Sequence, residues 1–496
     1  MSRHLLDKRF GSWLLLSSVM LAGCTPKLSE DDNQSSLTND IGAPRDLAGT
    51  RDLAGTRDLA STSDLAGVEL LSSVVITDPA VLSHFTLDRV FDQLVSLSGT
   101  TRPGAQVYKQ AWDTLRPKAG SLFPADAHCD DNGGTLNGFP NDCRAEAAIS
   151  NGTPADFVPV GLFNRFDLAP KNGATCGEYR IIYAKNISAP PNGRAFVIFE
   201  GSLPNPNPSC GLAACMPIVN LWKSLGDPQH PPASLDVTDA MEQLYFTGVP
   251  GFEPVVHPGH YGAGKPGGQV RTDLFVQGQW QLREYHIARS SRGITTRNGY
   301  LRFVPVPVAN NPFGKLFDET QVFPQSAAFR TAFLANMGSL LVDDIPRLAM
   351  STPLAFDGAR SNSQFTMDGD NYTSSLAGPT FPSAIAQRAA ALGRPDLTAA
   401  NIAARAMTQS CAGCHALSRS QPPLGGAISP LWPSSLGFTH IDENRNLSPA
   451  LRTVFLPFRQ QVLDTFASTP ENGICAVSAP VDDGLTIGGQ PVGAAN

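Results

Sequence analysis

Charged residues are scarce in this chain of 496 residues. They make up 16% of it, and 44 acidic against 37 basic side chains leave a net charge of −7 at pH 7. This balance offers no general attraction to a phosphate backbone, so we expect no binding to nucleic acid. Aromatic residues reach only 8%, but the hydrophobic fraction of 42% is enough for one large or two ordinary globular cores.

Long apolar runs and common hydrolase motifs are also missing. Beyond the first thirty residues no stretch of eighteen uninterrupted apolar residues occurs, so we expect a body that does not span a membrane. Neither HExxH nor GxSxG is present, which removes the signatures of zinc proteases and α/β-hydrolases. The chemistry of the chain must therefore come from another motif.

The first residues have the pattern of an export signal. Basic side chains precede an apolar run over 13–22 that is short for a membrane span. The run ends in Leu-Ala-Gly-Cys24, which resembles the lipobox of bacterial lipoproteins and implies a signal peptide over 1–24 with acylation of Cys24. Thr25, in place of an Asp, implies an outer-membrane destination. An ordinary signal peptide with an incidental cysteine is the alternative.

A polar segment with a short repeat follows the anchor. Residues 45–50 and 51–56 are identical hexapeptides, and two degenerate copies follow them. One leucine per copy cannot bury a continuous core, so the repeat indicates a solvated tether and not a β-helix. We predict a disordered linker over 25–68.

The body of the chain changes character along its length. Apolar residues at spacings of three and four predict helices over 79–98 and 106–115, and again over 325–341 and 383–410, the last broken by Gly393 and Pro395. Short apolar runs separated by Gly, Pro and Asn predict strands at Tyr179–Tyr183, Ala195–Phe199, Val270–Val276, Trp280–His286 and Tyr300–Val306.

These patterns predict an α+β fold. A central domain over 69–380 should hold an antiparallel sheet with flanking helices, and a mainly α-helical region should cover 381–475. A flexible tail is expected over 476–496.

The strongest chemical signal is the CxxCH motif Cys411-Ala-Gly-Cys414-His415. Its two thiols can form thioethers with the vinyl groups of a haem, and the adjacent histidine can supply the proximal iron ligand. A disulfide between the two cysteines and a contribution to another metal site are the competing interpretations.

The remaining cysteines form an even set. Nine cysteines less Cys24 and the two of the CxxCH motif leave six, which is compatible with three disulfides in an exported protein. Local loops between Cys129 and Cys143 and between Cys210 and Cys215 are candidates, although the sequence does not determine the connectivity.

Residues 395–466 resemble a small c-type cytochrome domain. A helix predicted over 397–409 runs into the CxxCH motif, and apolar residues over 451–466 predict closing helices divided at Pro457. The resemblance implies one covalent haem c per chain, an electron-transfer role, and a proline at 422–423 whose backbone supports the proximal histidine.

The second axial ligand departs from the usual pattern, because no Met follows residue 407. His440 is the only histidine downstream of the motif, so the iron would have either two histidine ligands or an open distal position. A surface or hydrogen-bonded role for His440 is the alternative. Trp432 and Phe438 can pack on a porphyrin or serve as core aromatics.

Two further groups of polar residues are candidates for a binding site. His257 and His260, with Glu253 upstream, can ligate a metal on a loop, but the absence of another spaced ligand favours a surface loop. Charged residues in or beside the predicted strands can form a buried ion network or a ligand pocket, with the network preferred: Arg165, Asp167, Glu178, Arg180, Arg283 and Glu284.

Three segments, 163–168, 176–180 and 280–284, are similar to those of a group of bacterial envelope proteins without an assigned activity. Taken together, the sequence predicts an outer-membrane-anchored mono-haem c-type protein, held by lipid on Cys24, which exchanges electrons with an unidentified redox protein. A haem-dependent oxidase or peroxidase acting on a small molecule, and a disulfide-stabilised binding lipoprotein without haem, are the alternatives.

Overall fold

The computed structural model describes residues 72–99, 102–112, 133–141, 152–188, 193–227, 229–262, 267–276, 279–290, 300–362 and 371–469. All of them belong to one compact unit over residues 59–496. The predicted signal peptide with Cys24, the linker, the tail, Cys129, Cys143 and Cys475 lie outside the described residues. No helix in the described ranges is long and apolar enough to cross a membrane.

An antiparallel sheet of eight strands dominates the fold, which confirms the predicted α+β class with a sheet-rich central part. Its strands lie in the order β1 (Val75–Ile76), β4 (Phe157–Arg165), β5 (Thr175–Lys185), β6 (Ala195–Pro204), β7 (Gln269–Val276), β8 (Gln279–Ser290) and β10 (Ser361–Asn362), and β9 (Tyr300–Val306) also pairs with β8. Each of the strand segments expected from the sequence lies within β5 to β9. A separate pair joins β2 (Thr135–Leu136) to β3 (Phe139–Pro140).

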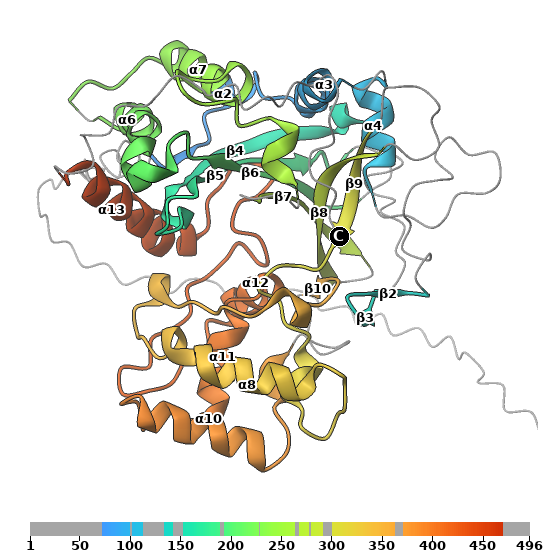
Figure 1. The fold of residues 1–496 in the computed structure, drawn as a ribbon. Helices are drawn as coiled ribbons and strands as arrows, with labels where there is room; N and C mark the ends of the chain where they lie inside the picture. Colours follow the sequence, from blue (N-terminus) through green and yellow to red (C-terminus); the bar gives the residue numbers. More distant parts are fainter. Residues whose placement is uncertain are drawn as a thin grey trace, which may run out of the picture. The chain divides into compact units, whose positions relative to one another are not determined.

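Helices cover one side of the sheet, as Figure 1 shows for α2, α3 and α7. They are α2 (Pro79–Leu82), α3 (Leu87–Ser98), α4 (Gly104–Gln110), α6 (Met216–Leu225) and α7 (Ser234–Glu242), which continues into the π-helical turn η4 (Gln243–Thr247). Helix α3 begins where the Thr86 side chain accepts a hydrogen bond from the Arg89 N–H, and it ends at Gly99, whose φ is 65°. Its buried face carries Val90, Phe91 and Leu94, the apolar spacing that predicts a helix here.

A second hydrophobic core is built from helices that follow the sheet in the chain. It includes η6 (Gly314–Phe317), α8 (Ser326–Asn336), η7 (Met337–Leu340), α9 (Tyr372–Ser375), α10 (Thr380–Ala391), α11 (Ala399–Met407) and α12 (Cys411–Ser420). Phenylalanines from three of these elements meet: Phe317 lies 5.0 Å from Phe329 and 6.3 Å from Phe381, measured between ring centroids. The helical segments predicted around 325–341 and 383–410 are confirmed, and the latter is interrupted between Ala391 and Ala399.

The last described segment returns to the sheet. The π-helical turn η10 (Leu451–Phe455) runs directly into α13 (Leu456–Ala467), so the chain stays helical up to Pro457 and the predicted division coincides with the change from π-helical to α-helical winding. Leu456 and Leu463 are buried in the same core as the sheet. The Phe466 ring lies 4.7 Å from that of Phe166, and α13 contacts α6 (Figure 1).

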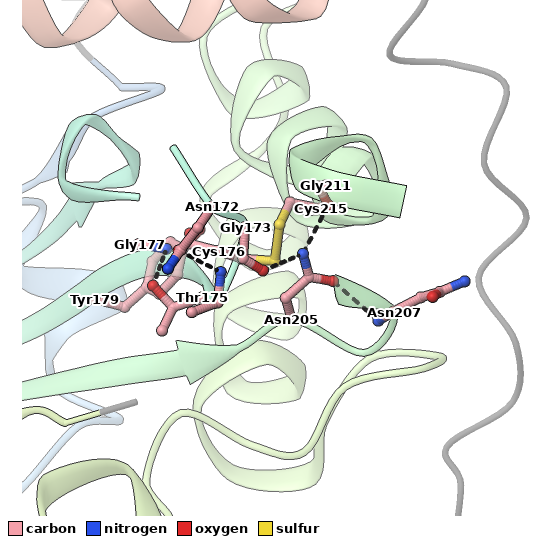
Figure 2. Close-up of a disulfide and its surroundings, with 11 residues drawn as sticks. Asn172, Gly173, Thr175, Cys176, Gly177, Tyr179, Asn205, Asn207, Gly211 and Cys215 are labelled. Atoms are coloured by element: carbon pink, nitrogen blue, oxygen red, sulfur yellow. Dashed lines mark hydrogen bonds between the residues drawn. A yellow bond between two sulfur atoms is a disulfide. The ribbon is translucent and has the colours of Figure 1, made fainter. Parts of the chain in front are cut away.

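One disulfide joins Cys176 of β5 to Cys215, at the end of the 3-10 segment η3 (Pro208–Cys215). Figure 2 shows the bond beside Asn205, whose amide donates to the carbonyl oxygens of Gly173 and Gly211. The expected pairing of Cys210 with Cys215 is therefore wrong, because the chain turns Cys215 toward a β-bulge that presents Cys176 in the core. Cys210 is also disulfide-bonded.

Replacing Cys176 and Cys215 by alanine is expected to lower the free energy of unfolding by about 3 to 4 kcal/mol, because the bond closes a loop with a sequence separation of 39. Urea denaturation measures the change, and Ser209→Ala, on the exposed part of η3, serves as the control. Equal denaturation midpoints for the double variant and the wild type would contradict the stabilising role.

Candidate functional site

The CxxCH motif forms the first turn of α12. Ser410 is the N-cap: its φ and ψ of −79° and 147° are extended, and its hydroxyl accepts from the Gly413 N–H at 3.1 Å. The expected helix running unbroken into Cys411 is therefore wrong, because α11 ends at Met407 and a new helix begins. A Cβ at Gly413 would lie 2.0 Å from the Met407 carbonyl oxygen, so this turn requires glycine inside the motif.

Cys411 and Cys414 are both free thiols. The start of their helix is fixed to the sheet, since the Ala412 N–H donates to the Ser361 hydroxyl of β10 at 2.8 Å. Burial raises the pKa of Cys411 to about 11 and that of Cys414 to about 12. Burial thus favours the protonated thiols over the thiolates.

The structure brings His440 to the CxxCH motif. The rings of His415 and His440 lie 4.8 Å apart between centroids, at an angle of 57°, and His440 Nε2 lies 3.5 Å from Cys414 Sγ. His440 Nδ1 is hydrogen-bonded to the Ser448 hydroxyl at 3.0 Å. Burial, and then the nearby His415 and Arg459, hold the pKa of His440 well below its ordinary value of 6.5.

His415 is oriented by a backbone carbonyl. Its Nδ1 contacts the carbonyl oxygen of Phe438, which fixes the tautomer that leaves Nε2 with a lone pair. The expectation that a proline at 422–423 supplies this carbonyl is wrong, because the Pro422 oxygen accepts from the Trp432 N–H instead. The chain that follows α12 turns back so that Phe438, and not the nearer prolines, reaches the histidine.

Trp432 and Phe438 differ in their surroundings. Trp432 is buried in the second core, where its Nε1–H donates to the Ser418 hydroxyl at 2.9 Å. Phe438 packs against the sheet core, and the Arg419 guanidinium lies 5.2 Å from its ring centre. Neither side chain lines the cavity beside the two histidines.

A cavity of about 150 Å³ lies between the sheet and the chain after α12. Apolar side chains of β4, β5 and β6 form one wall, namely Phe163, Ile182, Phe196 and Ile198. His415, His440, Ile441 and Leu451 form the other wall. An apolar cleft with a few convergent polar groups is typical of a cofactor or ligand site.

Three guanidinium groups and one carboxylate, that of Asp273, also line this cavity. Arg165 pairs with Asp167 at 2.9 Å, and Arg180 pairs with Glu200 at 3.0 Å. Arg459, on α13, also lines the cavity, and within the described ranges no carboxylate lies within ion-pairing distance of it. Burial, followed by the neighbouring Arg165, lowers the pKa of Arg459, while the Asp167 and Glu178 carboxylates act to raise it. An anionic ligand in the cavity would give this guanidinium a closer partner.

Comparisons with protein-family models, with curated proteins and with solved structures find no match to this chain. The site therefore stands on its own geometry.

The charged residues predicted on the strands form an ion network, as preferred, and part of that network also borders the cavity. Arg271 of β7 links Glu200 at 2.8 Å to Glu284 at 3.0 Å, beneath Cys411. Arg283 donates to the amide oxygen of Asn141 at 3.2 Å. Sequence reasoning missed Glu200, Arg271 and Arg459. The signal for the first two was a charge directly beside an apolar residue in a predicted strand.

A buried carboxyl group lies near this network. Burial, and to a smaller extent Glu284, raises the pKa of Asp357 to about 7. Its Oδ2 accepts from the Asn310 N–H at 3.1 Å. In the unfolded chain an aspartate titrates near 3.8, so between these values the folded state keeps a proton that the unfolded state has lost.

Stability is therefore expected to fall as the pH rises from about 4 to about 7 and to level off above. Asp357→Asn should remove this dependence and raise the free energy of unfolding at pH 8 by up to about 4 kcal/mol. Urea denaturation at three pH values measures it, with the exposed Asp344→Asn as the control. An unchanged pH profile in Asp357→Asn would refute the assignment.

Proposed function

We propose that the chain is a mono-haem c-type protein of the bacterial envelope that transfers single electrons. The observation that carries the proposal is the CxxCH motif on the first turn of a helix, with both thiols free and with His415 lining a cavity. In this role Cys411 and Cys414 carry one haem c, and His415 is its proximal ligand.

The surroundings of the motif suit a porphyrin. One face of the cavity is apolar, which suits the macrocycle, and its arginines suit the propionates. Arg459 is the residue assigned to a propionate, because it lines the cavity and, unlike Arg165 and Arg180, forms no direct ion pair among the residues that the structure describes. The contact of His415 Nδ1 with the Phe438 carbonyl leaves the other ring nitrogen for the iron.

His440 is proposed as the second axial ligand. It lines the same cavity, and Ser448 orients its ring from the far nitrogen. The two rings lie 4.8 Å apart between centroids, so His415 and His440 would hold one metal ion between them only in a somewhat more open arrangement. Bis-histidine ligation gives a lower reduction potential than ligation by histidine and methionine.

The haem would supply a reversible one-electron oxidation and reduction, and the residues of the cavity would hold the haem in place. The proposal places the lipid-bearing Cys24 in the outer membrane, with residues 25–68 as a tether between the lipid and the globular part. An unidentified redox protein is the expected partner. Because one wall of the cavity belongs to the sheet, the sheet would also contribute to the environment of the haem.

The test is the visible spectrum and the intact mass of the mature chain, expressed in a host that matures c-type cytochromes. One covalent haem per chain and a redox titration that fits a one-electron step are expected. A colourless chain that differs from the calculated mass only by disulfides would overturn the proposal and favour a binding lipoprotein. A spectrum with haem whose iron binds added cyanide without displacing His440 would favour the oxidase or peroxidase alternative.

A further inference from the structure

Glu253, His257 and His260 gather on the loop that crosses from η4 to β7. Each offers one ligand atom, and these atoms all lie within 4.8 Å of one another. It is the only such group of three that the described part of the chain contains. His257 precedes the short 3-10 turn η5 (Pro258–Tyr261), and His260 lies within it. The loop packs on β6, β7 and β8, so the sheet fixes its position.

The spacing of the three ligand atoms suits a small divalent ion. Glu253 Oε2 lies 3.6 Å from His257 Nδ1 and 3.5 Å from His260 Nε2. Zinc bonds of about 2.0 to 2.2 Å in tetrahedral geometry place neighbouring ligand atoms roughly 3.3 to 3.6 Å apart. Two of the distances between ligand atoms therefore already match those of a tetrahedral zinc site. The two imidazole rings lie 5.0 Å apart between centroids.

The decisive residue is His260. It is 1% exposed, and its Nδ1 donates to the carbonyl oxygen of Val255 at 3.2 Å, because a carbonyl can only accept. Because Nδ1 is occupied by this bond, Nε2 is the ring nitrogen left for a ligand; it is buried and faces the Glu253 carboxylate at 3.5 Å. A positive charge is required between these two groups, and either a proton on the ring or a bound metal ion supplies it. A ring nitrogen that donates to a backbone carbonyl is also the usual arrangement of a metal-binding histidine.

His257 completes the group at the turn. Its Nδ1 accepts a hydrogen bond from the Gly259 N–H at 3.2 Å, so this nitrogen carries a lone pair on the side of Glu253. A bound ion would take the place of that N–H. The Glu253 side chain is 61% exposed, which leaves the remaining coordination position open to solvent.

We propose that Glu253, His257 and His260 bind a divalent transition metal of the zinc class. Two imidazoles and one carboxylate favour such an ion over calcium or magnesium, which prefer oxygen ligands alone. Three protein ligands with an open fourth position are the arrangement of metal sites that exchange a water or a small ligand. The site is separate from the CxxCH motif and does not depend on haem.

Zinc titration of the mature protein, stripped with a chelator and followed by calorimetry, tests the site. The wild type should bind one zinc ion that the double variant Glu253→Gln/His257→Gln binds at least ~100-fold more weakly. Both substituted side chains are polar and reach the surface, and equal thermal unfolding without metal shows that the variant folds. His260 is left unchanged because it is buried.

Two comparisons make the outcome specific. Asp227→Asn/His230→Gln removes an exposed histidine–carboxylate pair without a third ligand and should leave zinc binding unchanged. Cys411→Ala/Cys414→Ala should also keep the zinc ion. Wild-type affinity in Glu253→Gln/His257→Gln, or loss of the ion only when the cysteines are replaced, would overturn the proposal.

Discussion

Replacing Cys411 and Cys414 together by alanine is expected to remove all covalently bound haem. Each thiol is free and lies on the first turn of α12, so no other cysteine of that helix can take its place. Intact mass should decrease by one haem, and the haem absorption that survives denaturation should disappear completely. Single replacements should leave a haem held by one thioether, with an altered absorption band.

The control lies on the same helix. Ser420→Ala changes an exposed residue near the end of α12 and should retain one haem per chain. His415→Ala should lose the proximal ligand and His440→Ala should change the spectrum of the iron while keeping the covalent bond. If the double cysteine variant still carried one covalent haem per chain, attachment through this motif would be refuted.

Arg405→Met is expected to destabilise the protein by about 3 to 5 kcal/mol, the typical cost of breaking a buried ion pair by removing one partner. Arg405 is fully buried in α11, and it forms an ion pair with Asp343 at 2.7 Å. Its guanidinium also donates to four carbonyl oxygens, those of Leu340, Val342, Leu424 and Gly425. Methionine has a similar length but leaves every one of these acceptors without its donor.

Chemical denaturation measures the effect, and Arg388→Met is the matched control because Arg388 is exposed on α10. Arg405→Lys should fall between the two, since an ammonium keeps the charge but cannot reproduce the planar set of donors. If Arg405→Met lowered the free energy of unfolding by less than about 1 kcal/mol, water would have to replace the guanidinium, which would contradict the complete burial of this side chain.

Local patterns predicted most of the fold. The strands β5 to β9 were found because their apolar runs end at Gly, Pro and Asn, and the break after α10 was found because Gly393 and Pro395 interrupt the spacing. The missed start of α12 was also local, since Ser410 before the motif is an ordinary N-cap. The motif itself and His440, brought together in the fold, were identified from sequence alone.

Other features depend on segments far apart in the chain. The bond between Cys176 and Cys215 follows from a bulge in β5 that no periodicity reveals. Arg459 interrupts an otherwise apolar helix face, and its place in the cavity depends on how α13 lies across the sheet. The group formed by Glu253, His257 and His260 is local by contrast: the sequence shows it, and the turn η5 brings its ligand atoms together.

The return of the last helix to the sheet has a consequence for the order of events during biosynthesis. Ile441, Leu451, Leu456 and Leu463 complete a core whose strands are made much earlier in the chain. The chain is synthesised from its N-terminus, so the sheet keeps an uncovered apolar surface until these residues have been made. Both cysteines of α12 are made before them. Cys411 and Cys414 are thus accessible while their wall of the cavity is still incomplete, and docking of α13 ends that interval.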